Sequence, residues 1–232
     1  MPFFMRKDLI MNEKIKAKAV SAAFSFAAFI LFTIVVKVFD VQPIGLNDTN
    51  IGCATINSAM QRLIGTNDFW YRYTEILGYF AIVCMFAFAL VAFCMLVRKK
   101  SLKGVDYRLY ALGVFYVIML AFYVFFEKVI INYRPVLEDG ELEASYPSSH
   151  TMLIICVMIT AVHQFSYLLS QKTMRDAASA AACILAVSAP VGRLLAGVHW
   201  FTDIIGGILL SIALIALYHL MCTVIASRIS KT

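Results

Sequence analysis

Six long apolar segments constrain this chain more than any other feature of its sequence. Each has about 20 residues, the length that a helix needs to cross the hydrocarbon core of a bilayer. Unbroken apolar runs exclude a transmembrane barrel, because barrel strands alternate apolar and polar side chains. The sequence therefore predicts an all-α, multi-pass membrane protein with a bundle of six transmembrane helices. The six segments are roughly Val20–Phe39, Leu77–Val97, Leu109–Ile131, Thr151–Leu169, Ala177–Leu195 and Phe201–Ile225.

The composition agrees with one membrane-embedded domain. Hydrophobic residues make up 62% of the 232 residues and charged residues only 15%, whereas soluble domains carry about 25% charged residues. No linker divides the chain, so residues 1–232 are expected to form a single domain. The first apolar segment is too long for the core of a signal peptide, and no small-residue cleavage site clearly follows it, so we expect it to be retained.

The basic residues predict the orientation in the membrane. Fourteen of the 20 Lys and Arg residues lie in 1–19, 98–108, 170–176 and the C-terminal tail, which share one side of the bilayer. Cytoplasmic segments carry the excess of basic residues, so both termini are expected in the cytoplasm. The net charge of +6 then mostly reflects the orientation of the protein in the membrane. The sequence has no basic stripe with interleaved aromatic residues, so it does not point to nucleic-acid binding. Residues 1–18 are expected to form an interfacial helix or a disordered basic tail.

Three polar clusters share the opposite, outer face in this topology. They are EKVIINYRP (127–135), YPSSH (146–150) and GRLLAGVHWFTD (192–203), all within a core of about residues 109–225. Ser148 and Ser149 precede an apolar segment, so either could cap its helix, and a helix N-terminus is a ready anion site. Arginine suits phosphate because its planar fork donates two hydrogen bonds at once. Together these features predict a phosphate pocket that includes Lys128, Arg134 and Arg193.

Two histidines add the chemistry of phosphoryl transfer, which needs a nucleophile and an acid for the leaving oxygen. His199 and His150 could divide these roles. Asp203 lies four residues after His199, hence on the same helical face, where it could accept the Nδ1 proton and leave Nε2 to attack. Each element taken singly has a plainer explanation, such as a helix cap, a snorkelling arginine or an ordinary ion pair. Their convergence on one face favours a site.

These motifs resemble the phosphatidic acid phosphatase type 2 superfamily, which includes membrane lipid phosphatases and soluble vanadium haloperoxidases. Its signature has three parts, K-x6-R-P, P-S-G-H and S-R-x5-H-x3-D. This chain has KVIINYRP (128–135), PSSH (147–150) and the spacing of Arg193, His199 and Asp203. The motifs cover somewhat under half of the chain, and their order and spacing make the match specific.

The resemblance implies a reaction and a role for each residue. His199 would be the nucleophile that forms a phosphohistidine, Asp203 would orient it, and His150 would protonate the leaving group. Water would then release phosphate, with no metal or cofactor. The residues expected to hold the phosphoryl oxygens are Lys128, Arg134, Ser148, Ser149 and Arg193. The absence of any CxxC spacing also speaks against a zinc site.

Three departures from the signature affect binding rather than the reaction. Lys128 lies six residues before Arg134 where the family has seven, and Glu127 occupies the seventh position. Ser149 replaces a glycine, and Gly192 replaces the serine before Arg193. The carboxylates of the loop 138–143 lie between two phosphate-binding motifs. We interpret them either as a solvated loop or as an acidic rim that disfavours highly anionic soluble phosphates or recruits a divalent cation.

The sequence thus predicts an integral membrane hydrolase of a lipid phosphate or diphosphate. A lipid could present its head group to the pocket while its chains remain in the bilayer. Undecaprenyl diphosphate, phosphatidic acid and phosphatidylglycerol phosphate are candidates, because the motifs recognise phosphate and not the lipid tail. There are two alternatives. One is a lipid phosphotransferase with the same phosphohistidine, and the other is a non-enzymatic lipid-binding or transport protein. The short chain suggests a bacterial plasma membrane enzyme with its site on the outer face. The oligomeric state is not readable.

Overall fold

The computed structural model describes residues 3–101, 104–138 and 140–229, and confirms the six predicted membrane helices. Each of the six is long and apolar enough to cross a bilayer. A short helix, α2, and a single 3₁₀ turn, Leu46–Asp48, lie between the first two. The helices are α1 (Phe3–Val38), α2 (Ala54–Ile64), α3 (Asp68–Lys99), α4 (Tyr107–Lys128), α5 (Ser149–Leu168), α6 (Lys172–Ala196) and α7 (Phe201–Ile229).

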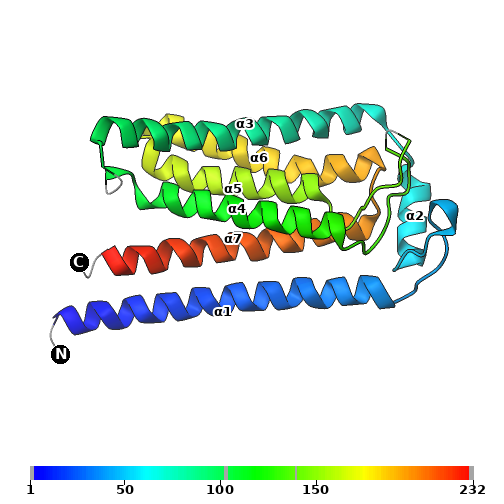
Figure 1. Ribbon diagram of the computed structural model, residues 1–232, viewed down its shortest axis with the longest axis horizontal. Coiled ribbons are helices and arrows are strands. Elements are labelled where there is room, and N and C mark those ends of the chain that lie inside the picture. Colours follow the sequence, from blue (N-terminus) through cyan, green and yellow to red (C-terminus); the bar gives the residue numbers. More distant parts are fainter. Residues whose placement is uncertain (1–2, 102–103, 139, 230–232) are drawn as a thin grey trace.

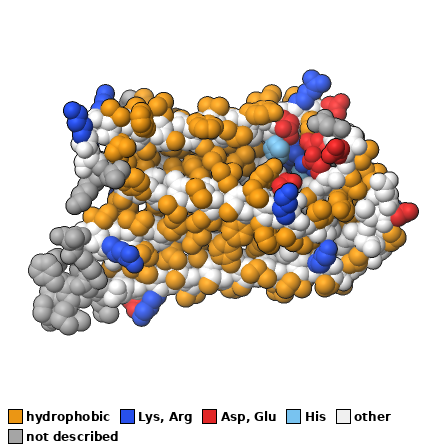
Figure 2. Space-filling view, viewed as in Figure 1, with side chains coloured by type: hydrophobic (Ala, Val, Ile, Leu, Met, Phe, Trp, Pro, Cys, Tyr) orange, Lys and Arg blue, Asp and Glu red, His pale blue; other side chains and the backbone are white. Residues whose placement is uncertain are grey.

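The helices run side by side as one bundle (Figure 1). Helix α5 packs between α6 and α7, and α1 lies along α7 at one edge. Both termini lie at one end of the bundle, while α2 and the loop that precedes α5 lie at the other. Apolar side chains cover most of the visible face and charged ones gather toward the two ends (Figure 2). The surface therefore has the apolar band that a bilayer requires.

Polar side chains fix where several helices begin. The Asn67 carboxamide accepts hydrogen bonds from the amides of Phe69 and Trp70 and so caps α3. Asp106 caps α4 by accepting from the amide of Arg108 at 2.9 Å. A cap of this kind satisfies amides that have no partner within the first turn of the helix. Because of its cap, α3 begins at Asp68 rather than at Leu77, where the apolar run starts.

From Phe3 onward, the N-terminal segment forms neither a separate interfacial helix nor a disordered tail but the first part of α1. Helix α1 begins at Phe3 and continues without a break to Val38, and its membrane-spanning part covers Ile10–Val38. At about 1.5 Å per residue, 36 residues extend well beyond the ~30 Å hydrocarbon core. No Gly or Pro lies between Phe3 and the end of the apolar run to stop a helix, so one helix covers both segments from Phe3 onward.

Helix α2 supports the turn between α6 and α7. The Asn57 carboxamide is fully buried, and it both donates to Thr202 Oγ1 at 2.9 Å and accepts from the Thr202 amide at 3.1 Å. Gln61 donates to the carbonyl of Gly197 at 2.9 Å. Gly197 has a positive φ of 71°, and a Cβ there would lie only 1.8 Å from the carbonyl oxygen of Gly65. The turn that carries His199 is therefore held in place by α2, which lies outside the three motifs.

Candidate active site

The three polar clusters predicted to share one face do meet at one end of the bundle. The 129–148 loop pairs with itself through the backbone of Tyr133 and Ala144, and Trp200 Nε1 donates to the carbonyl of Tyr133 at 2.7 Å. This bond attaches the loop to the turn before α7. The amide of Ser148 in turn donates to the carbonyl of Asp203 at 3.0 Å. Loop, turn and the start of α5 therefore form one connected structure.

His199 is held through Ser145 rather than directly by Asp203. The His199 Nδ1–Asp203 Oδ2 distance is 3.9 Å, too long for the direct hydrogen bond that the spacing predicted. Ser145 Oγ lies between them, 3.0 Å from Nδ1 and 2.5 Å from Oδ2. The carboxylate can only accept, so the hydroxyl donates to Asp203. The hydroxyl oxygen is then free to accept a bond from the histidine.

The surroundings of His199 select one tautomer of its ring. The Ser145 carbonyl oxygen lies 3.1 Å from Nδ1, and a carbonyl can only accept. Nδ1 therefore carries the proton and Nε2 carries the lone pair. Nε2 is buried and has no hydrogen-bond partner among the described residues. Burial lowers the pKa of His199 well below 6.5, and the nearby Arg134, Arg193 and His150 lower it further. The ring is thus neutral and buried, with the lone pair of Nε2 unpaired among the described residues.

Asp203 is the anchor of this group and is fully buried. Its Oδ2 also accepts a bond from the amide of Trp200 at 2.9 Å, and Asn132 Nδ2 approaches Oδ1 at 3.5 Å. A buried carboxylate needs such partners to offset the loss of its hydration. The predicted orienting role of Asp203 remains a prediction, and the structure adds Ser145 as the group through which it would act.

Two buried arginines point unused donors into this region. Arg193 is fully buried, and its Nε and Nη2 have no hydrogen-bond partner among the described residues. Arg134 forms ion pairs with Glu138 and, at 3.4 Å, with Glu143, while its Nε has no partner within the described part of the chain. Buried donors are normally satisfied, so these nitrogens are available to bind an anion such as a phosphoryl group.

His150 lies in the first turn of α5. Its Nε2 is 3.1 Å from Glu75 Oε1, and its buried Nδ1 has no partner among the residues that the structure describes. Of the two serines predicted as possible caps of this helix, Ser148 is the one that caps it. Its Oγ accepts a hydrogen bond from the amide of Thr151 at 3.4 Å. Ser148 is fully buried in this capping position.

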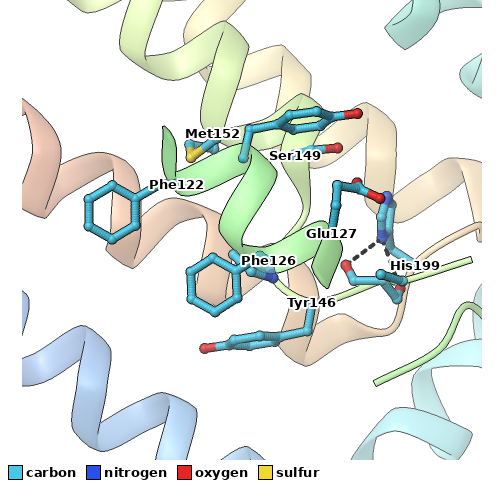
Figure 3. Close-up of a pocket in the computed structure, with 11 residues that line it drawn as sticks. Phe122, Phe126, Glu127, Tyr146, Ser149, Met152 and His199 are labelled. Atoms are coloured by element: carbon cyan, nitrogen blue, oxygen red, sulfur yellow. Dashed lines mark hydrogen bonds between the residues drawn. The ribbon is translucent and has the colours of Figure 1, made fainter. Parts of the chain in front are cut away.

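Ser149 and Lys128 were both predicted to hold phosphoryl oxygens, but only Ser149 lines a cavity of the site. Ser149 lines a cavity of about 10 Å³ together with Glu127 and His199 (Figure 3). A cavity of about this volume holds one water molecule. Lys128 is exposed at the last residue of α4 and is not among the residues that line this cavity or the larger one beside it. The structure therefore brings Glu127, not Lys128, to the side of His199.

The acidic loop is turned partly inward. Glu138 and Glu143 contact Arg134, and Glu138 also accepts a bond from the Tyr71 hydroxyl at 2.8 Å. Glu141 is exposed, and Asp139 lies outside the described residues. Two of the carboxylates thus act as counter-ions in the site rather than as a purely solvated loop. Within the described residues no cluster of His, Cys, Asp and Glu is arranged to hold a metal ion.

Sequence reasoning missed two residues of this site, Ser145 and Glu75. Ser145 adjoins the motif that contains His150, but nothing in the sequence shows that its hydroxyl lies between two residues of the third motif. Glu75 lies in the first apolar stretch of α3, and an ionisable residue inside a membrane helix is a functional candidate by default. The apolar run predicted from the sequence begins at Leu77, two residues later, so Glu75 falls just outside it and the signal is missed.

Comparison with known proteins confirms the resemblance that the motifs predicted. Residues 128–225 match the model of the PAP2 superfamily. The fold is similar to the crystal structure of a transmembrane PAP2 type phosphatidylglycerolphosphate phosphatase from Bacillus subtilis, with a TM-score of 0.57 and 18% sequence identity. That similarity covers 86% of this chain and 94% of the other. A comparison with curated proteins finds no match. The protein is thus a multi-pass membrane protein with a transmembrane PAP2 fold.

Proposed function

We propose that this protein is an integral membrane phosphatase that hydrolyses a lipid phosphate or diphosphate through a phosphohistidine. One observation carries the proposal: the lone pair of His199 Nε2 is buried close to unpaired nitrogens of Arg134 and Arg193. Arginine nitrogens suit the three oxygens of a phosphoryl group, and a neutral imidazole suits attack on its phosphorus. The match of residues 128–225 to the PAP2 superfamily supports the same reaction class.

A large groove beside the site supports a lipid substrate. Its volume is about 780 Å³, and it joins the polar groups of the site to the membrane-facing sides of α3, α4 and α5. Arg134 and His150 lie at its polar end, whereas Phe86, Ala89 and Gly113 line it farther along these helices. A lipid could place its phosphate on the arginines while its chain stays among apolar side chains. Charged groups beside a histidine at this end are visible in Figure 2.

The first chemical step follows from these positions. His199 Nε2 donates its electron pair to phosphorus, and a P–N bond forms as the bond to the leaving oxygen breaks. The proton on His150 passes to that oxygen, so that an alcohol or a lipid monophosphate departs in neutralised form. The proton of His199 stays on Nδ1, which donates to Ser145, and the Ser145 hydroxyl donates in turn to Asp203, so the carboxylate stabilises the positive ring. Arg134 and Arg193 offset the charge on the phosphoryl oxygens.

The second step returns the enzyme to its starting state. A water molecule attacks phosphorus, the P–N bond breaks, and His199 regains its lone pair. His150, neutral after the first step, takes a proton from the water, and phosphate leaves. The water-sized cavity between Glu127, Ser149 and His199 provides space for such a molecule next to the nucleophile (Figure 3).

The position of the basic residues supports an orientation. Both termini lie at the end of the bundle opposite the site. The positive-inside rule then favours cytoplasmic termini and a site near the outer leaflet, in keeping with a bacterial plasma membrane enzyme. The Bacillus subtilis protein of similar fold is described as a phosphatidylglycerolphosphate phosphatase, so phosphatidylglycerol phosphate is tested beside phosphatidic acid and undecaprenyl diphosphate.

The test is phosphate release from these three lipids in detergent by the wild-type protein and by His199→Ala. We expect release from at least one lipid, and a loss of about 10⁴-fold or more in His199→Ala. Vanadate, which mimics the transferring phosphoryl group, should inhibit the wild type. Phosphate release that survives intact in His199→Ala, or complete insensitivity to vanadate, contradicts the mechanism.

A lipid phosphotransferase is the enzymatic alternative, because the same phosphohistidine could pass its phosphoryl group to a second lipid. A labelled lipid diphosphate offered together with an acceptor lipid separates the two. Free labelled phosphate indicates a hydrolase, and labelled acceptor indicates a transferase. Binding of the lipid without either product would favour a lipid-binding or transport protein.

A further inference from the structure

A carboxylate outside the motif-bearing core joins the two halves of the site. Glu75 lies on α3, two turns after its start, whereas the superfamily match begins at residue 128. Its Oε1 is 2.9 Å from Arg193 Nη1 and 3.1 Å from His150 Nε2. One oxygen atom therefore contacts both the proposed acid and one of the proposed phosphate-binding groups. The Glu75 side chain is 24% exposed, so water reaches the pair.

Two glycines allow α3 to come this close. A Cβ on Gly192 would lie 2.7 Å from Thr74 Cγ2, so a larger residue would push α3 away from α6. A Cβ on Gly78, one turn after Glu75, would lie 3.0 Å from His150 Cδ2. The imidazole thus rests in a space that Gly78 leaves open, with the carboxylate at its edge. Thr74 adds a 3.2 Å bond from Arg193 Nη1 to its hydroxyl.

Glu75 uses only part of the donor capacity of its two partners. It occupies Nη1 of Arg193 and leaves Nε and Nη2 without a partner in the described part of the chain. It occupies Nε2 of His150 and leaves the buried Nδ1 likewise unpaired. The carboxylate therefore does not block the nitrogens that a phosphoryl group and its leaving oxygen would use. Its contacts fix the orientation of both side chains before the substrate arrives.

We propose that Glu75 is a positioning residue that holds the His150 ring aligned to donate its proton to the leaving oxygen. A carboxylate oxygen can only accept, so Nε2 of His150 carries a hydrogen toward Glu75, and this contact fixes the rotation of the ring. Glu75 forms no bond to the substrate and takes part in no proton transfer with it. It acts through His150, and Arg193 fixes the position of the carboxylate in turn. This inference rests on the phosphatase function proposed above.

The proposal makes the effect of Glu75 depend on the leaving group. An alcohol leaves a lipid phosphate as a strongly basic oxygen, so its departure needs the proton from His150. A nitrophenolate leaves p-nitrophenyl phosphate readily without protonation. A lipid monophosphate, the leaving group of a diphosphate, lies between these two. Loss of Glu75 should therefore harm phosphatidic acid turnover most, diphosphate turnover less and aryl phosphate turnover least.

The experiment compares kcat for phosphatidic acid and p-nitrophenyl phosphate in wild type and Glu75→Gln. We expect a loss of about 10- to 100-fold on the lipid, less than the ~10²–10⁴-fold that general acid catalysis contributes as a whole because His150 itself remains, and about threefold or less on the aryl phosphate. Glu75→Asp, which keeps the charge, should recover part of the loss. Asp68→Asn removes an exposed carboxylate from the same helix and should leave both rates unchanged. Equal losses on both substrates, or none on either, overturn the proposal.

A second measurement covers the case in which Glu75→Gln folds poorly. In a His150→Ala background, adding Glu75→Gln should cause no further loss on phosphatidic acid, because its effect passes through a ring that is already absent. Additive losses contradict the proposal. The two levels of inference fail differently: a wild type that releases no phosphate, or an active His199→Ala, removes the phosphatase function and this inference with it. A normal wild type with additive losses removes only the role of Glu75.

Discussion

The two halves of the chain contribute to the site in different ways. Residues 128–225 provide the groups proposed to touch the phosphoryl group, among them Arg134, Arg193 and His199. The preceding half provides supporting groups: Glu75 on α3 contacts Arg193, and Asn57 on α2 contacts Thr202 at the start of α7. One half therefore carries the chemistry and the other holds it in place. Substitutions in the two halves should then have different signatures in kinetics and in stability.

The largest effect is expected for Arg193→Ala in the motif half. This change removes two unpaired donors from the phosphate position and leaves Glu75 without a charged partner from α6. Loss of a single such donor costs about 10²–10³-fold in an oxyanion site, so kcat/KM on the best lipid should fall by at least about 10²-fold. Arg62→Ala, which changes an exposed arginine on α2, is the control. A small loss in Arg193→Ala would remove this arginine from the chemical half.

Ser145→Ala tests whether the motif half also contains a supporting group. The hydroxyl links His199 to Asp203, but the Ser145 carbonyl still holds Nδ1 in the variant. Loss of one hydrogen bond to a charged group, about 1.5–3 kcal/mol, predicts a fall in kcat of roughly 10- to 100-fold with little change in KM. Steady-state kinetics with the best lipid substrate measures both. An unchanged kcat would show that the carbonyl alone orients the ring.

Asn57→Ala addresses the supporting half directly. The change removes two hydrogen bonds to Thr202 in a fully buried place, and it leaves the Thr202 amide and hydroxyl unsatisfied. We expect a loss of about 1–3 kcal/mol in the free energy of unfolding, measured by thermal unfolding in detergent, and only a few-fold loss in kcat. A large loss of kcat at unchanged stability would break the division between the two halves.

The smallest effect is expected when the pH is lowered, because the protonation state of His199 should not change. Its pKa is lowered below 6.5, so the ring stays neutral as the pH drops from 7.5 through 6.5, where an exposed histidine becomes half protonated. NMR of protein labelled at histidine, with the His199 signal identified by its loss in His199→Ala, follows this directly. Titration of that signal with a midpoint near 6.5 would show that burial does not control the nucleophile.

The sequence was sufficient for the membrane helices and for the residues of the motifs, because both depend on local patterns. An apolar run of about 20 residues has one structural solution in a bilayer, and His199 with Asp203 follows a fixed spacing. The supports depend on packing instead. Asn57 reaches Thr202 across 145 positions and Glu75 reaches Arg193 across 118, and no local pattern encodes such pairs. Lys128 lies one residue closer to Arg134 than the family signature requires, which already indicated a different position. The structure leaves that residue exposed.

The groove between α3 and α4 has a consequence for how this protein meets its substrate. Tyr79, Phe86 and Leu120 line it and are also exposed on the apolar outer surface, so it opens sideways into the bilayer. A molecule that enters by this route diffuses in two dimensions, and its relevant concentration is a fraction of the surrounding lipids rather than a molarity in water. Diluting the substrate with inert detergent or lipid at constant bulk concentration should therefore slow the reaction.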